Sequence, residues 1–144
     1  MIRELLVECR VLPTIDSVRS VRREIEGALK TMLPARTVSD VVLVVSELCT
    51  NAIEAADNGA CDVIVRVGVP SSRAVTIEVE DCGAGFKLQD DFMSSATESD
   101  ESGRGLRIVN WVADDLEVER QPGKTVVRAL LRGDEPFELP RNFE

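Results

Sequence analysis

The feature of this chain that most constrains its fold is the order of two hydrophobic periods along it. Apolar residues recur at the spacing of an amphipathic helix in two consecutive segments, from Thr14 to about Leu33 and from Thr37 to about Ala56. The segments before and after them alternate apolar and polar residues, which is typical of a strand with one buried face. The expected strands cover residues 2–12, 62–69, 74–80, 116–120 and 125–131, and a short third helix covers residues 106–113.

This order predicts the fold class. Pro34 separates the two long helices, and Thr37 with Asp40 resembles a capping box that opens the second one. The last four strands form two pairs joined by short turns at residues 70–73 and 121–124, so each pair is expected to be an antiparallel hairpin. We therefore expect an α/β (α+β) two-layer sandwich, in which a mostly antiparallel mixed sheet carries helices on one face.

The length of 144 residues indicates one domain, expected at residues 1–132, followed by a loose tail at 133–144 that holds two prolines. No apolar run is long enough to span a membrane, and the N-terminus does not read as a secretory signal, so we expect a cytoplasmic protein. None of the four cysteines stands at CxxC spacing, which favours reduced thiols over a disulfide framework.

Composition excludes several classes of function. With 17 basic and 26 acidic residues the formal net charge is −9, and only five residues are aromatic, so the chain lacks the charge and the stacking surfaces that nucleic acid binding needs. Anionic membranes are disfavoured for the same reason. The chain has no histidine, which excludes a Ser-His-Asp triad, a histidine-ligated zinc site and phosphotransfer to a histidine of its own. A general base must then be a carboxylate or a lysine.

Three polar side chains share one face of the second helix. Glu47, Asn51 and Glu54 are spaced by four and three residues, which places Asn51 and Glu54 within about 40° of Glu47 around the helix. Taken alone, this stripe is more simply interpreted as the solvated face of an amphipathic helix.

Two glycine motifs lie on either side of a long irregular segment. The run from Asp81 to Phe86 reads DCGAGF directly after a strand, where an aspartate can accept a hydrogen bond from an amine and the glycines allow a planar ligand to approach. The run from Gly103 to Arg107 reads GRGLR before a helix, where free backbone N–H groups and the helix dipole favour a phosphate. Alone, each is also compatible with an ordinary glycine-containing turn. A segment as long as residues 81–105 is usually functional.

Together and in this order, these features resemble the ATP-binding fold of the GHKL superfamily, which includes gyrase, histidine kinases and mismatch-repair ATPases. Within it, the chain looks most like the bacterial anti-sigma-factor serine kinases. The stretches SELCTNA at residues 46–52 and GRGLRIV at 103–109 carry that likeness, as does WVAD at 111–114. The resemblance covers roughly residues 2–131 and implies the histidine-kinase-like (Bergerat) fold.

The resemblance also implies a role for each motif residue. Glu47 would be the general base, Asn51 would bind Mg²⁺, and Asp81 would bind the adenine amine. The residues implied to contact ATP are Asn51, Asp81, Gly83, Gly85, Phe86, Gly103, Arg104, Gly105, Leu106 and Thr125. Arg104 would also assist catalysis by neutralising charge on the γ-phosphate, and residues 87–102 would form a lid. Lys124 stands where family members have the glycine of a Gly-Thr pair.

The implied function is that of an ATP-dependent protein-serine kinase with Mg²⁺ as cofactor. It would sequester a sigma factor and phosphorylate a serine of an anti-anti-sigma partner with a STAS domain, and family members are usually homodimers. Two alternatives remain open on the sequence: a nucleotide-gated binding protein without useful kinase activity, and a detached histidine-kinase catalytic domain that acts on a partner's histidine.

Overall fold

The computed structural model describes residues 4–55, 62–82, 109–133 and 137. In chain order the helices and strands are β1 (Glu4–Val11), α1 (Ile15–Leu29), α2 (Ala35–Ala55), β2 (Val63–Ser71), β3 (Ala74–Asp81), β4 (Asp115–Gln121) and β5 (Lys124–Arg132). A single helical turn covers residues 109–112. The order predicted from the hydrophobic periods is therefore confirmed for the described part of the chain.

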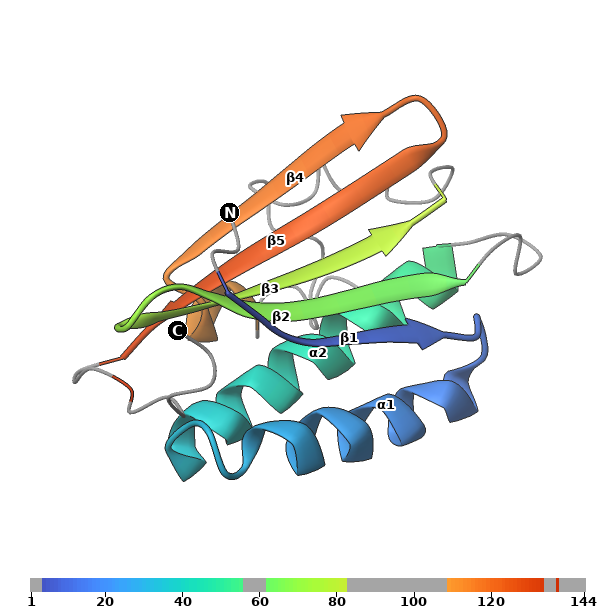
Figure 1. The fold of residues 1–144 in the computed structure, drawn as a ribbon. Coiled ribbons are helices and arrows are strands. Elements are labelled where there is room, and N and C mark those ends of the chain that lie inside the picture. Colours follow the sequence, from blue (N-terminus) through green and yellow to red (C-terminus); the bar gives the residue numbers. More distant parts are fainter. Residues whose placement is uncertain (1–3, 56–61, 83–108, 134–136, 138–144) are drawn as a thin grey trace.

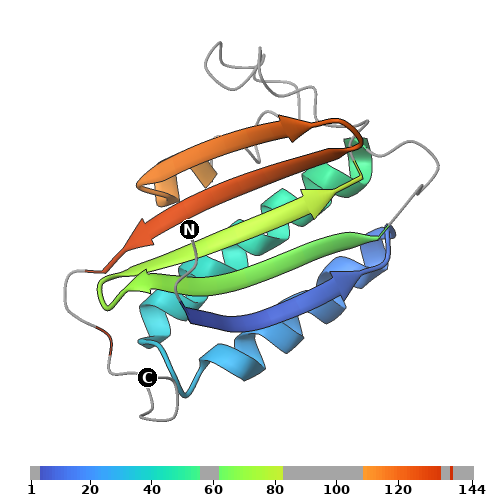
Figure 2. The same ribbon diagram turned by 45° about the horizontal axis from the view of Figure 1, so that its top comes forward.

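The five strands form one sheet in the order β1-β2-β3-β5-β4. Each neighbouring pair in this sheet is antiparallel, so the predicted mostly antiparallel sheet has no parallel pair among the described strands. Helices α1 and α2 lie side by side across one face of the sheet (Figures 1 and 2). The predicted two-layer sandwich with helices on one face is confirmed.

Both long helices differ from their predicted bounds at the loop between them. Helix α1 ends at Leu29 rather than near Leu33, because the backbone N–H groups of Met32 and Leu33 both turn back to the carbonyl oxygen of Leu29. Helix α2 begins at Ala35, so Thr37 lies inside its first turn and does not open it. The carbonyl oxygen of Pro34 accepts the N–H of Val38 at 2.9 Å and starts the helix earlier.

The core lies between the helices and the sheet. It is made of the inward-facing alternate residues of the central strands and the apolar stripes of both helices, and its largest fully buried side chains include Ile25, Leu29, Leu48 and Ile77. Burying a side chain of this size contributes about 1.5–3 kcal/mol. Phe137 also joins the core, and its backbone N–H donates to the carbonyl oxygen of Ser72 at 2.6 Å.

The other face of the sheet carries charged side chains that pair across the strands. Arg66 on β2 contacts Glu8 on β1 at 2.7 Å and Glu80 on β3 at 3.0 Å. Arg128 on β5 contacts Glu78 on β3 at 2.7 Å. Cross-strand pairs of this kind stabilise the sheet on the face that the helices leave uncovered.

Two further predictions concern the turn at residues 121–124 and the state of the cysteines. Gly123 occupies the turn between β4 and β5 with φ of +75°, a backbone conformation that glycine adopts without strain. Cys9 and Cys49 are buried free thiols as expected, whereas Cys82 is disulfide-bonded, so the prediction of reduced thiols is wrong for Cys82. Disulfides form between residues close in space, which sequence spacing does not report.

In the described part of the chain, none of the helices has the length and hydropathy needed to cross a membrane.

Candidate functional site

Helix α2 carries the first pair of predicted site residues. Glu47 and Asn51 are one helical turn apart, and the apolar stripe that includes Val45 and Leu48 fixes the orientation of the helix on the sheet. Glu47 is half-buried, and Asn51 is buried with 8% of its surface exposed. The C-terminal end of α2 lies next to the C-terminal end of β3, below it in Figure 1 and behind the sheet in Figure 2. Asn51 is therefore on the part of α2 that approaches the end of β3.

Strands β3 and β5 carry the second pair. Asp81, the last residue of β3, is the register partner of Thr125 at the start of β5. Asp81 is two residues from Val79, and Thr125 is two residues from Val127, so each points to the same face of the sheet as its buried neighbour. That face is the one covered by the helices. Asp81 is 5% exposed and Thr125 is 1% exposed. The structure thus places together two residues that are 44 positions apart in the sequence.

Burial singles out the predicted site residues. In the described segments the buried polar or charged side chains are Asn51, Thr76, Asp81 and Thr125, and three of these four are predicted ATP contacts. Burying a polar group is costly unless it is hydrogen-bonded, and it is therefore uncommon outside structural networks and binding sites. The amide nitrogen Nδ2 of Asn51 is buried without a hydrogen-bond partner among the described residues. The Asn51 amide is thus a buried polar group that the described residues leave unsatisfied.

The described donors fit Mg²⁺ held chiefly by a nucleotide. No group of three or more acidic, cysteine or histidine side chains that could hold a metal occurs in residues 4–55, 62–82, 109–133 and 137. Mg²⁺ commonly uses one or two protein oxygens and completes its octahedron with phosphate oxygens and water. The amide oxygen of the buried Asn51 suits this role.

Glu47 has the electrostatic environment of a base. Burial raises the pKa of its carboxyl group above the ordinary value, and the negative charge of Glu54 raises it further, while Arg22 of α1 lowers it. A carboxylate with a raised pKa takes up a proton more readily. Glu54 shares the polar face predicted from the sequence. The sequence did not predict that Arg22 belongs to the site, because Arg22 lies on another helix and only packing brings it near Glu47. The one signal in the sequence is that Arg22 lies on the polar face of the amphipathic α1.

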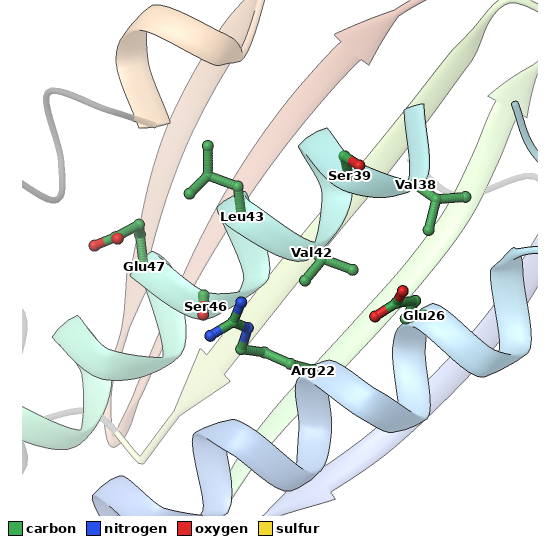
Figure 3. Close-up of a pocket in the computed structure, with 8 residues that line it drawn as sticks. All are labelled: Arg22, Glu26, Val38, Ser39, Val42, Leu43, Ser46 and Glu47. Atoms are coloured by element: carbon green, nitrogen blue, oxygen red, sulfur yellow. The ribbon is translucent and has the colours of Figure 1, made fainter. Parts of the chain in front are cut away.

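A groove between α1 and α2 ends at Glu47. It has a volume of about 420 Å³, and we refer to it as the α1–α2 groove. Figure 3 shows the guanidinium group of Arg22 beside Ser46, and Glu47 at the end of the row of lining residues on α2. Its lining residues are Arg22, Glu26, Val38, Ser39, Val42, Leu43, Ser46 and Glu47. A volume of this size lies within the range of ligand-binding clefts.

Lys124 lines a pocket of about 230 Å³ that Asp81 also lines. Its side-chain nitrogen is 3.6 Å from the carboxylate of Glu80, on the charged face of the sheet. Thr125 points to the opposite face because neighbouring strand residues alternate. Lys124 and Thr125 therefore lie on opposite faces of β5, and Lys124 still lines the pocket at the end of β3.

The remaining predicted site residues lie outside the described residues. They are Gly83, Gly85, Phe86, Gly103, Arg104, Gly105 and Leu106, together with the predicted lid at residues 87–102. Their roles stay predictions from the sequence.

Comparisons with known proteins agree with this geometry. The family model "Histidine kinase-like ATPase domain" matches residues 11–131. An anti-sigma F factor from Thermoanaerobacter pseudethanolicus is 32% identical over 96 residues, which cover 63% of this chain and 67% of that protein. The serine-protein kinase RsbW from Bacillus licheniformis is 33% identical over 100 residues, 62% of each chain.

A solved structure shares the fold at low sequence identity. The RsbU and RsbW domains of a protein from Mycobacterium tuberculosis superpose with a TM-score of 0.66 and 18% identity, over 94% of this chain and 33% of that one. The match of the family model extends from the end of β1 to the end of β5 and includes every predicted site residue. The chain belongs to the histidine kinase-like ATPase domain family.

Proposed function

We propose that this chain is an ATP-dependent protein-serine kinase with an anti-sigma role. It binds a sigma factor and phosphorylates a serine of an anti-anti-sigma partner with a STAS domain. The observation that carries the proposal is the burial of Asn51, Asp81 and Thr125 within one family fold, with Glu47 one turn from Asn51. The names of the relatives, anti-sigma F factor and serine-protein kinase, support the same role.

In this proposal the buried polar residues bind the nucleotide. The Asp81 carboxylate accepts a hydrogen bond from the exocyclic amine of adenine, and the hydroxyl of its register partner Thr125 contacts the same base. The amide oxygen of Asn51 binds Mg²⁺. When bound, MgATP supplies the γ-phosphoryl group that is transferred.

Glu47 then acts on the acceptor. Its carboxylate accepts the proton of the serine hydroxyl as the serine oxygen forms its bond to phosphorus and the bond to the leaving ADP breaks. Burial and the negative charge of Glu54 raise the pKa of Glu47, which strengthens it as a base, and the positive charge of Arg22 acts in the opposite direction. With no histidine in the chain, a carboxylate is the group suited to this step.

Further parts of the proposal concern assembly and location. We infer a homodimer that binds the sigma factor, in the cytoplasm where ATP and both partners would be present. Size-exclusion chromatography with light scattering measures the dimer directly.

The experiment that tests the kinase replaces the base and leaves the nucleotide contacts in place. Glu47→Gln is expected to reduce phosphate transfer to a STAS-domain acceptor by about 10²–10⁴-fold while MgATP still raises the melting temperature. Glu119→Gln is the matched control, because it makes the same chemical change at an exposed carboxylate on β4, outside the predicted site. Transfer at the wild-type rate in Glu47→Gln would remove Glu47 from the mechanism. Nucleotide binding without transfer in the wild type would favour a nucleotide-gated binding protein, and an acid-labile phosphoryl product would favour histidine phosphorylation.

A further inference from the structure

The α1–α2 groove contains two opposite charges in a fixed order. Arg22 and Glu26 are one turn apart on α1, and because α1 and α2 run in opposite directions, Arg22 lies toward the Glu47 end of the groove (Figure 3). Neither side chain forms an ion pair or a side-chain hydrogen bond with any residue in the described segments, although eight charged contacts are formed elsewhere in them. A ligand in the groove would therefore meet the positive charge of Arg22 nearer Glu47 and the negative charge of Glu26 farther from it.

The floor of the groove is apolar. Val38 and Val42 are 6% and 9% exposed, and Leu43 is one of the few large apolar side chains on the surface. From Val38 to Glu47 the helix advances nine residues, about 13 Å. An extended chain covers this length with about four residues. A short extended segment with a partly apolar surface fits the groove in length and character.

The spacing of the charges matches alternate residues of an extended chain. Side chains four residues apart on a helix are about 6 Å apart along the axis. Side chains two residues apart on an extended strand lie on the same side at about 6.6 Å. One acidic and one basic residue, separated by a single residue, can therefore face Arg22 and Glu26 together.

We propose that the α1–α2 groove binds the acceptor segment of the protein substrate in an extended conformation, with the serine at Glu47, an acidic side chain at Arg22 and a basic side chain at Glu26. This inference rests on the proposed kinase function, because the position of Glu47 at one end of the groove assigns the serine to that end. It adds a sequence preference to that function: an acidic residue nearer the serine, and a basic residue farther from it.

Peptide binding measured by NMR tests this inference without ATP. The probes are two heptapeptides, Ala-Ser-Ala-Glu-Ala-Lys-Ala and its charge-swapped form Ala-Ser-Ala-Lys-Ala-Glu-Ala, each also made in the reverse chain direction. They are added at millimolar concentration to ¹⁵N-labelled protein, and the amide signals of Ser39, Leu43 and Ser46 are followed. The peptide with the acid nearer the serine is expected to shift these signals and to bind about threefold to tenfold more tightly than its charge-swapped form, since each exposed ion pair contributes up to about 1 kcal/mol.

Variants make the test specific. The double variant Arg22→Glu/Glu26→Arg keeps the net charge and should reverse the preference between the two peptides. Arg23→Glu is the matched control, because Arg23 is an exposed neighbour on α1 that does not line the groove, and it should leave the preference unchanged. Circular dichroism melts check that each variant folds.

The outcomes separate this inference from the proposed function. Absence of shifts at these three amides, equal binding of both peptides, or an unchanged preference in the double variant would overturn the inference. The phosphate-transfer and nucleotide-binding measurements on Glu47→Gln would be unaffected by that result. Binding with the expected preference, together with unaltered transfer in Glu47→Gln, would keep the groove as a peptide site and reject Glu47 as the base.

Discussion

Replacing Asn51 with leucine should stabilise the protein and abolish nucleotide binding at the same time. The buried Nδ2 group of Asn51 has no hydrogen-bond partner among the described residues, and an unsatisfied buried donor costs about 1–3 kcal/mol. Leucine has a similar branched shape and a higher helix propensity, worth a further few tenths of a kcal/mol. For 144 residues the unfolding entropy is about 0.3 kcal/mol/K, so the melting temperature should rise by about 3–10 °C.

The assay is a thermal melt with and without MgATP. In the wild type, nucleotide at about 100 times its dissociation constant adds about 2.7 kcal/mol to the stability, which corresponds to about 9 °C on the same scale. In Asn51→Leu this shift should be lost, because leucine offers no oxygen to the metal.

Thr76→Val is the control, since Thr76 is also a buried polar residue but does not belong to the predicted site. It should retain the full MgATP shift. A variant Asn51→Leu that melts below the wild type and still responds fully to MgATP would show that the amide is a structural group, and the reasoning from its burial would be refuted.

Three further predictions concern single groups. Glu54→Gln removes a negative charge that raises the pKa of Glu47, so the acid limb of the pH–rate profile should move to lower pH; a shift to higher pH, or none, would contradict the electrostatics. Gly123→Ala places a Cβ on a residue with φ of +75° and should cost about 1–2 kcal/mol in a urea melt, whereas unchanged stability would mean that the turn adapts. Burial raises the pKa of Cys9 and of Cys49 to about 12, so iodoacetamide at pH 8 should modify these thiols only after denaturation, as followed by mass spectrometry; rapid labelling of the folded chain would contradict their burial.

Local patterns predicted the helices and strands well because each has its own period. The stripe of Val18, Val21, Ile25 and Leu29 marks one helix, and all four are buried in the structure. The errors fall at the ends of elements, as at Leu29 and Ala35, where a few backbone hydrogen bonds in the connecting loop decide the boundary. Hydrophobic periodicity carries no information about those bonds.

The candidate site divides in a similar way. Glu47, Asn51 and Asp81 could be named from the motifs, because each motif is continuous in the sequence. The position of Arg22 beside Ser46 could not, since it depends on how two helices pack. The bonding of Cys82 was missed because the spacing of cysteines in a sequence carries no information about which of them lie close in space.

The amino-acid sequence alone thus specifies the order of helices and strands, the single covered face of the sheet and the residues with suitable chemistry, since these depend on periodicity and side-chain type. Tertiary structure adds the register that pairs Asp81 with Thr125, the burial of three polar side chains and the groove that joins Arg22 and Glu26 to Glu47. These features depend on contacts between distant segments. Such contacts are fixed only when the helices bury their apolar faces on the sheet, because that packing selects one register and one helix orientation.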